Sequence, residues 1–225
     1  MRRVFSGQQM CYSHSHGQPV SGDPPSETNL REQDICVTTE RTSSPIAQLA
    51  VLLQPLLSLP PVRRTRRNHG LEHATIHVLA GRIRGLKMAG RSNADGFVLL
   101  GEASTEAVAS AVREALHRMR AGERALAVHP NCGTNLVTAG FLATIVSMLG
   151  FAGGTRRDMW NRMPLVMSLI MLAFVAAQPL GMALQRHLTT DGDPADLEVV
   201  SITRSTVSLP FGAPLTVHRI VTRSS

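Results

Sequence analysis

Two histidines and a glutamate stand at positions 69, 72 and 73, within the stretch NHGLEHATIHVL. In a helix, residues three and four apart share one face, so His69, Glu72 and His73 project together. Two imidazoles at this spacing can bind one divalent ion, and the glutamate can accept a proton from water on that ion. The stretch therefore predicts either a metal site or an amphipathic helix that happens to carry histidines.

A second pair of candidate ligands lies in HPNCGTNL, residues 129–136. His129 and Cys132 are three residues apart in a turn, and both residue types bind zinc. The turn leads into one apolar stretch, and the helix that carries His73 follows another. We therefore expect both sets of candidate ligands to lie at the same surface of the membrane. The predicted metal ligands are His69, His73, His129 and Cys132, with Zn²⁺ as the expected ion. The alternative for the turn is a helix cap with a buried thiol.

Coordination number separates two functions for this site. If Cys132 stands aside, three histidines leave a fourth position open for water, and Glu72 is the catalytic base of a hydrolase, such as a peptidase or amidase. If Cys132 binds as well, the site is closed, and the protein is a scaffold or interaction module. The glutamates available as another ligand look solvent-facing; they are Glu102, Glu106, Glu114 and Glu123. His77 is left in a bystander or supporting role.

Two stretches without charged residues predict a transmembrane hairpin. Residues 134–153 and 163–184 are each long enough to cross a bilayer core, which takes about 20 apolar residues. A short arginine-rich loop with Trp160 connects them. Gly140 and Ala143 offer small surfaces for close helix packing. The alternative is a buried helical hairpin in a soluble core.

The hairpin places residues 63–133 and 186–225 on the same side of the membrane. Most arginines near the membrane ends lie on that side, so the positive-inside rule puts the metal-binding domain in the cytoplasm. The three arginines of the connecting loop argue for the opposite orientation. Residues 45–62 are apolar but short for a span, and they predict a membrane-associated segment.

The predicted fold class is α+β: a small helix/sheet domain at the membrane surface with a two-helix transmembrane hairpin. A β-hairpin is expected around residues 93–96, an amphipathic helix over 104–122, and a short strand at 125–128. The stretches LEVVSITRSTVSL and LTVHRIVT predict two strands of the same sheet. Residues 1–44 are polar and rich in helix breakers, and they predict a disordered tail. Its CYSHSHG tract is either a small metal-binding segment or plain unstructured chain.

The net charge of +7 points to an anionic partner. The arginines crowd beside apolar stretches, as at residues 63–67, so the expected partner is the lipid bilayer. Aromatic residues make up only 4% of the chain and no nucleic-acid motif is present, which argues against nucleic acid. Three cysteines do not form a disulfide framework. The sequence specifies no substrate and no oligomeric state.

Three stretches resemble the YqhQ-like family of uncharacterised bacterial membrane proteins, which are described as predicted metal-dependent enzymes. HGLEHATI is similar to its H-G-x-E-H-x-T-I signature, and HPNCGTNL to its H-P-x-C-G-T element. LQRHLTTDGDPADLEVV is similar to its stretch after the last membrane helix. The H-x-x-E-H spacing is also that of inverted zincins.

The resemblance implies a metal site built from His69, Glu72, His73, His129 and Cys132, in a multi-pass protein of the bacterial cytoplasmic membrane. This chain is shorter than that family and has fewer predicted spans. A polar loop after the last helix, with Thr189, Thr190, Asp191 and Asp193, either lines a substrate groove or caps that helix.

Overall fold

The computed structural model describes residues 44–208 and 214–225. The predicted disordered tail and its CYSHSHG tract lie outside these residues, except for Ser44. Within the part of the chain that is described, the fold is α+β, as predicted: helices accompany one four-stranded antiparallel sheet, and two of the helices are long and apolar.

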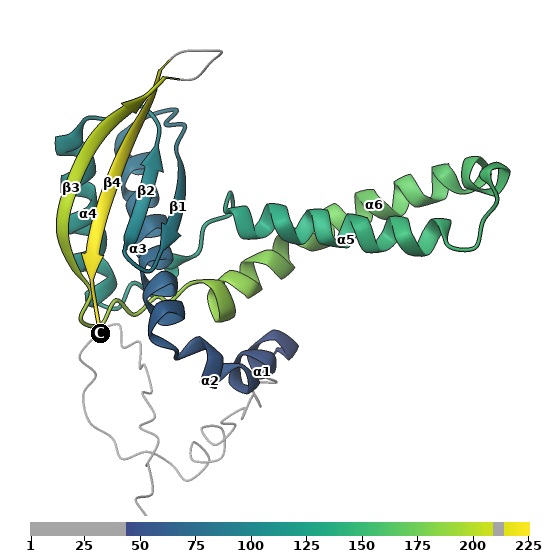
Figure 1. Ribbon diagram of the computed structural model, residues 1–225, viewed down its shortest axis with the longest axis horizontal. Helices are drawn as coiled ribbons and strands as arrows, with labels where there is room; N and C mark the ends of the chain where they lie inside the picture. The colour runs from purple at the N-terminus through teal and green to yellow at the C-terminus, as the bar shows by residue number, and fades with distance from the viewer. Residues whose placement is uncertain (1–43, 209–213) are drawn as a thin grey trace, which may run out of the picture. The chain divides into compact units, whose positions relative to one another are not determined.

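The sheet is built from two hairpins that come from distant parts of the chain (Figure 1). The first consists of β1 (Ala89–Asn93) and β2 (Gly96–Leu100), and the second of β3 (Glu198–Val207) and β4 (Leu215–Arg223). The order across the sheet is β1-β2-β4-β3, with every neighbouring pair antiparallel. The predicted hairpin near residue 93 and the two later strands are thus confirmed, and β1 and β3 form the two edges.

The turn between β1 and β2 depends on Gly96. Its φ is +146°, and a Cβ atom at this position would come within 2.0 Å of the carbonyl oxygen of Ile220 on β4. Glycine is therefore required both for the conformation and for the close approach of the strands. Asn93 supports the same turn by accepting a hydrogen bond from the backbone N–H of Asp95.

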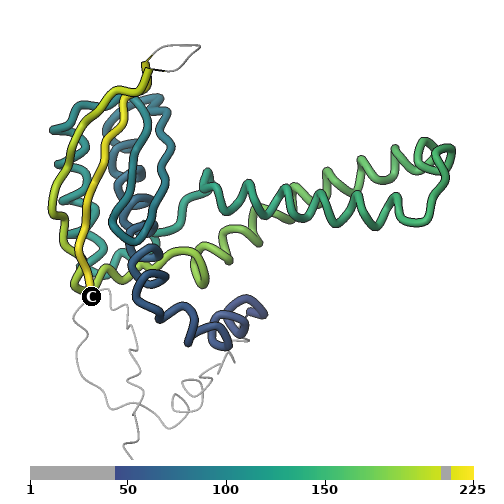
Figure 2. The backbone as a smooth tube through the Cα atoms, in the orientation of Figure 1, coloured from purple at the N-terminus to yellow at the C-terminus, as the bar shows by residue number. Residues whose placement is uncertain are grey.

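Helices α3 (Pro60–Arg82) and α4 (Thr105–Arg120) cover one face of the sheet (Figures 1 and 2). Ser104 caps α4 by accepting a hydrogen bond from the Ala107 backbone N–H, as expected from the sequence. The helices and strands share one apolar core. Its buried members include Leu71, Ala74, Val78 and Leu79 of α3, Phe97 and Leu99 of β2, Val108, Ala111, Val112, Ala115 and Met119 of α4, and Ile220 of β4.

Helices α5 (Gly133–Phe151) and α6 (Arg156–Leu184) lie side by side as a hairpin (Figure 2). By length and composition both could cross a membrane, and only 11% and 22% of their most apolar stretches are buried within the structure. A helix in a soluble core would be mostly buried, so the exposed apolar surface indicates membrane association. The loop expected around the three arginines is shorter than predicted, because α6 already begins at Arg156 under a capping box formed by Thr155 and Asp158.

The close contacts of this hairpin involve other glycines than the predicted one. A Cβ atom at Gly140 would meet nothing within 4 Å, so the expected close packing is wrong for Gly140. Gly150 instead faces Val166, where an added Cβ would lie 2.4 Å from a methyl carbon. Gly181 faces Asn135, and an added Cβ there would lie 2.2 Å from the Asn135 side-chain oxygen. Rotation of the helices about their axes decides which small residues face inward, and apolar composition alone does not fix that rotation.

Residues 45–57 form two short helices rather than a span. α1 (Pro45–Leu52) and α2 (Gln54–Leu57) are separated at Leu53, and α3 follows from Pro60. Prolines near the start of each helix impose these breaks, since proline has no N–H to continue a preceding helix. Both helices expose large apolar side chains, among them Leu49, Val51, Leu52 and Leu56.

The strand expected at residues 125–128 is wrong. Arg124–Ala127 forms a 3₁₀ turn, with backbone hydrogen bonds from Leu126 to Glu123 and from Val128 to Ala125. Four apolar residues between a helix and a proline turn do not distinguish a strand from a tight turn. The turn packs against α3, where its carbonyl groups become partners of two histidines.

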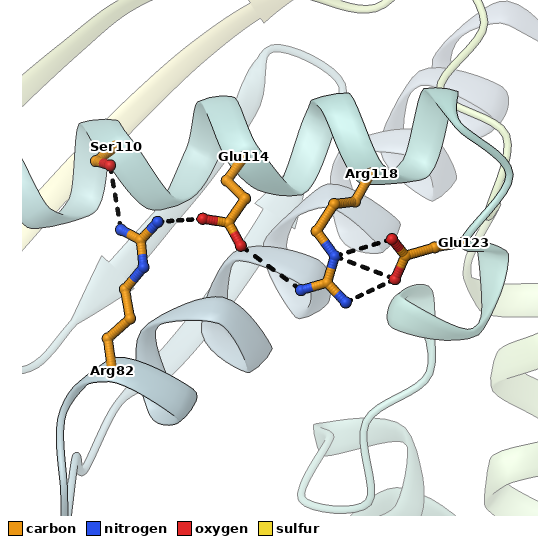
Figure 3. A network of polar contacts seen from close by, with 5 residues as sticks. All are labelled: Arg82, Ser110, Glu114, Arg118 and Glu123. Atoms are coloured by element: carbon orange, nitrogen blue, oxygen red, sulfur yellow. Dashed lines mark hydrogen bonds and ion pairs between the residues drawn. The ribbon is translucent and has the colours of Figure 1, made fainter.

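A buried asparagine joins α3 to both hairpins of the sheet. The side chain of Asn68 is fully buried, its Nδ2 donates to the carbonyl of Asn93, and its Oδ1 accepts from the Thr222 hydroxyl. A different contact joins α3 to α4 at the surface, where Arg82 pairs with Glu114 and Arg118 pairs with Glu114 and Glu123 (Figure 3). These surface groups are well exposed, so water screens their attraction.

Replacing Asn68 by alanine should lower the free energy of unfolding by about 1–3 kcal/mol, because two buried partners lose their hydrogen bonds. Thermal unfolding of the full chain in detergent micelles, followed by circular dichroism, measures the change. Glu114→Ala serves as the control and should have a much smaller effect. Equal effects of the two substitutions would show that Asn68 does not lock α3 to the sheet.

Candidate metal centre

The predicted row of α3 side chains faces the inside of the domain. Glu72 and His73 are buried and His69 is half-buried, and all three line one pocket, as the helical spacing predicts. The rings of His69 and His73 meet edge to face with centroids 4.4 Å apart. Both imidazoles therefore point into the same pocket. An amphipathic helix that merely happened to carry histidines would not need this arrangement.

Cys132 completes a group of three possible ligands with these histidines. One ligand atom each from His69, His73 and Cys132 lie within 4.8 Å of one another, and Cys132 Sγ is 3.4 Å from His69 Nε2. Ligand atoms bound to one tetrahedral ion at about 2.0–2.3 Å lie roughly 3–4 Å apart, so the pair of Cys132 and His69 has the required spacing and His73 lies near it. Among the described residues, this group could hold a metal ion.

Two backbone carbonyls hold the histidines in the form that binds metal. His69 Nδ1 lies 3.0 Å from the carbonyl oxygen of Thr189, and His73 Nδ1 lies 2.8 Å from that of Ala127. Because a carbonyl only accepts, each Nδ1 carries the proton and donates it. Each Nε2 then keeps its lone pair for a metal, which is the usual arrangement of histidine ligands.

Cys132 lies at the first turn of α5 and acts as its N-cap. Its sulfur accepts a hydrogen bond from the backbone N–H of Thr134 at 3.4 Å. Burial would raise the pKa of the thiol, but contacts with His73 and with the side chain and N–H of Thr134 outweigh it and lower the pKa. The start of a helix favours a thiolate. The cap and the candidate ligand are thus the same residue, although the sequence presented them as alternatives.

His129 lies beside the three-residue group rather than in it. Its ring centroid is 5.8 Å from that of His73 and 4.7 Å from that of His77. Its Nδ1 accepts a hydrogen bond from the backbone N–H of Asn131 at 3.1 Å. Burial first, and then the neighbouring His77 and His73, lower the pKa of His129 to about 4. At neutral pH its ring is neutral, with the proton on Nε2.

His77 is placed outside the group, in the supporting role that the sequence left open. Its Nε2 lies 2.9 Å from the carbonyl oxygen of Val128, which must accept. The 3₁₀ turn thus offers successive carbonyls to His73 and His77. Together these bonds hold the turn against α3.

Glu72 is buried beneath strand β1. Its carboxylate accepts a hydrogen bond from the Ser92 hydroxyl, and a Cβ atom at Gly90 would lie 2.2 Å from Glu72 Oε1. Burial raises the pKa of Glu72, while the Ser92 hydrogen bond and the electrostatic interaction with His69 oppose that rise. Glycine at position 90 therefore leaves the space that the carboxylate occupies.

The group opens into a pocket of about 420 Å³. Its lining includes His69, Glu72, His73, His129 and Cys132, together with residues 89–92 of β1. The downstream glutamates do not line this pocket. Glu114 and Glu123 pair with arginines at the surface, and Glu102 and Glu106 are exposed.

The stretch after α6 supports the site instead of lining its pocket. A π-helical turn, Gln185–Thr189, ends at the carbonyl that holds His69, and the Thr190 hydroxyl donates to the Gln185 carbonyl. Asp191 and Asp193 line a different pocket with Arg124. These contacts match the capping alternative considered for this loop.

Sequence reasoning missed a buried amide network under the HPNC turn. Gln185 is fully buried, accepts from the His129 backbone N–H at 2.9 Å and donates to Asn135 Oδ1 at 2.9 Å. Asn135 in turn donates to the Pro130 carbonyl. Two amides at the ends of otherwise apolar helices were the available signal, because such groups need partners when buried.

Arg66 and Gly70 fix the position of the stretch after α6. Arg66 donates to the carbonyls of Leu188 at 2.8 Å and Thr190 at 3.1 Å, and its own carbonyl accepts from the Asp191 N–H. A Cβ atom at Gly70 would lie 2.2 Å from the Asp191 carbonyl oxygen. Glycine is therefore needed where the two backbones meet.

The residues of the site fall inside a stretch that matches a known protein family. Residues 64–202 match the family described as a domain of unknown function, DUF6391. This chain belongs to the DUF6391 family. A similar protein, described as uncharacterised, comes from Picosynechococcus sp.; it is 32% identical over 154 residues, which are 63% of this chain and 72% of that protein. No solved structure matches the chain significantly.

The DUF6391 residues contain the whole three-residue group and its carbonyl partners. The match supports membership of an uncharacterised bacterial family. The more specific resemblance to the YqhQ-like family stays a prediction.

Glu72→Gln should stabilise the metal-depleted protein at neutral pH. A carboxyl whose folded pKa is raised contributes stability below its unfolded value of about 4.5 and loses it as the pH rises through the folded pKa. Above that range the buried charge costs stability, which the neutral amide avoids. Thermal unfolding in the presence of a chelator should therefore show a higher midpoint for Glu72→Gln.

The difference should vanish below about pH 4.5, where the wild-type carboxyl is protonated in both states. Glu106→Gln, at an exposed position of α4, should show no such pH-dependent gain. An unchanged or lower midpoint for Glu72→Gln at neutral pH would contradict the raised pKa.

Proposed function

We propose that this protein is a membrane-anchored, metal-dependent hydrolase that cleaves peptide or amide bonds. The observation that carries the proposal is the group of His69, His73 and Cys132, which opens into a pocket beside the buried Glu72. Three protein ligands leave a coordination position for water, whereas four close the site.

The donor set supports zinc as the ion. Two neutral imidazoles and one thiolate form a mixed nitrogen and sulfur site that suits a borderline metal. His129 would be a fourth ligand only if its Nδ1 gave up the hydrogen bond from Asn131, or if Nε2 lost its proton. We therefore assign the three-ligand set to the metal and leave His129 as a donor at the pocket wall.

The proposed reaction is hydrolysis with Glu72 as general base. A bound divalent ion would lower the pKa of water and polarise the substrate carbonyl. Glu72 accepts a proton as the water oxygen bonds to the carbonyl carbon, and returns it to the amine when the C–N bond breaks. Its raised pKa suits this exchange, because a base works best when its pKa approaches the working pH.

Several features support anchorage in a bacterial cytoplasmic membrane through both α5 and α6. Cys132 immediately precedes α5, and Thr189 ends the turn that continues α6. The site therefore lies where α5 starts and α6 ends. Arg63 and Arg64 at the start of α3 would lie on the same side as the site and near lipid headgroups, whereas Arg66 and Arg67 bind the stretch after α6 and Asp196. By the positive-inside rule this side is cytoplasmic.

One observation favours a second candidate, a structural metal site. The contact between His69 and Cys132 joins α3 to the first turn of α5, so a bound ion would tie the domain to the hairpin. In that case the protein would be a scaffold or interaction module. The two experiments that follow separate the candidates.

Purified protein should carry close to one zinc ion per chain, and His69→Ala, His73→Ala and Cys132→Ser should each lose it. The reason is that each variant removes one ligand from a three-ligand site. Elemental analysis by mass spectrometry after gel filtration in detergent measures the content. His77→Ala is the matched control, since it removes an imidazole from the same helix but outside the group.

His129→Ala should keep the metal, because the proposed shell has three protein ligands. Loss of metal in this variant would indicate a closed, four-ligand site and would favour the structural candidate. A wild-type protein that binds no zinc after reconstitution would rule out both candidates.

Glu72→Gln should retain zinc but lose peptide hydrolysis by about 100- to 10,000-fold, because the general base is removed while the ligands remain. Release of free amino groups from an unfolded, fluorescently labelled polypeptide measures the rate. Glu106→Gln should hydrolyse at the wild-type rate. Equal rates for Glu72→Gln and the wild type, or no hydrolysis by the zinc-loaded wild type, would remove the enzymatic proposal.

A further inference from the structure

The strand that borders the metal group is an edge of the sheet. β1 pairs with β2 on one side, and among the described residues no strand pairs with its other side. Along an edge strand, alternate residues direct their N–H and C=O groups away from the sheet. Residues Ala89, Gly90 and Arg91 are exposed, so this edge of the sheet borders solvent.

This edge lines the pocket that contains the three possible metal ligands. Four consecutive residues of β1, 89–92, line the pocket together with His69, His73 and Cys132. Gly90 and Ser92 lie against the Glu72 carboxylate. A chain bound along β1 would therefore run past both the metal group and the general base.

The two edges of the sheet are built differently. β3, the opposite edge, has a register irregularity between Val199 and Ser201, a device that discourages pairing with another strand. β1 pairs with β2 in an unbroken register from Ala89 to Asn93. The regular edge is thus the one beside the pocket.

We infer that the substrate is a polypeptide segment in extended conformation, which binds by adding a strand to the free edge of β1. Backbone hydrogen bonds would supply the affinity, as in other cases of strand addition. Residues of an extended chain advance about 3.3 Å each, with side chains on alternate faces, so one scissile carbonyl can face the metal group while its neighbours pair with β1.

The pocket also indicates which side chains the segment would carry. Ile76 and Met88 offer an apolar surface, and Arg91 is the only lysine or arginine of the described lining. Backbone pairing accepts most side chains, so selection would be weak and would favour apolar residues next to β1. Only the cleavage step rests on the proposed function; peptide binding at this edge does not.

Amide hydrogen exchange tests this inference with the zinc-loaded Glu72→Gln protein in lipid nanodiscs, so that a bound chain is not turned over. The probe is reduced, carboxymethylated lysozyme, an unfolded polypeptide. At a probe concentration ten times its dissociation constant, amide exchange in β1 should slow by about tenfold, because only the fraction of the protein without bound probe exchanges. β3 serves as an internal control and should be unchanged.

Unchanged exchange in β1, or equal slowing in β1 and β3, would overturn the inference. Hydrolysis of the same probe by the wild type is measured separately. Slowed exchange in β1 without hydrolysis would support strand addition and reject the hydrolase. Hydrolysis with unchanged β1 exchange would support the hydrolase and reject strand addition.

Discussion

The close contact between α3 and the stretch after α6 underlies the whole site. At Gly70 the helix backbone comes so near the Asp191 carbonyl that no side chain fits between them. Arg66 secures the same contact by hydrogen bonds to carbonyls left free at the end of the π-helical turn. This contact brings the Thr189 carbonyl to His69, so backbone packing decides the tautomer of a candidate ligand.

The site buries polar side chains whose loss of hydration is costly, and their hydrogen bonds offset this cost to different degrees. Glu72 loses solvation and regains one hydrogen bond, from Ser92. The amide of Gln185, in contrast, has a partner for both its oxygen and its nitrogen. The amide under the HPNC turn is thus fully hydrogen-bonded, while the Glu72 carboxylate is less well satisfied, which is a common feature of candidate functional groups.

Sequence reasoning recovered those features that local periodicity determines. The shared face of His69, Glu72 and His73 follows from helix geometry, and the β1–β2 hairpin from its turn residues. It did not recover that Cys132, and not His129, joins His69 and His73 in the group of possible ligands, because that depends on the conformation of one turn. The carbonyl partners of the imidazoles were also out of reach, since Thr189 lies 120 residues from His69.

The strand order has a consequence for biosynthesis. β4 lies between β2 and β3 in the sheet, yet both hairpin helices separate β2 from β4 along the chain. β2 therefore has no partner on that side until both helices have been synthesised and placed. Domains fold as their parts emerge from the ribosome, so synthesis of the α5–α6 hairpin precedes closure of the sheet. The pocket beside β1 therefore belongs to a sheet that can close only after both apolar helices have left the ribosome.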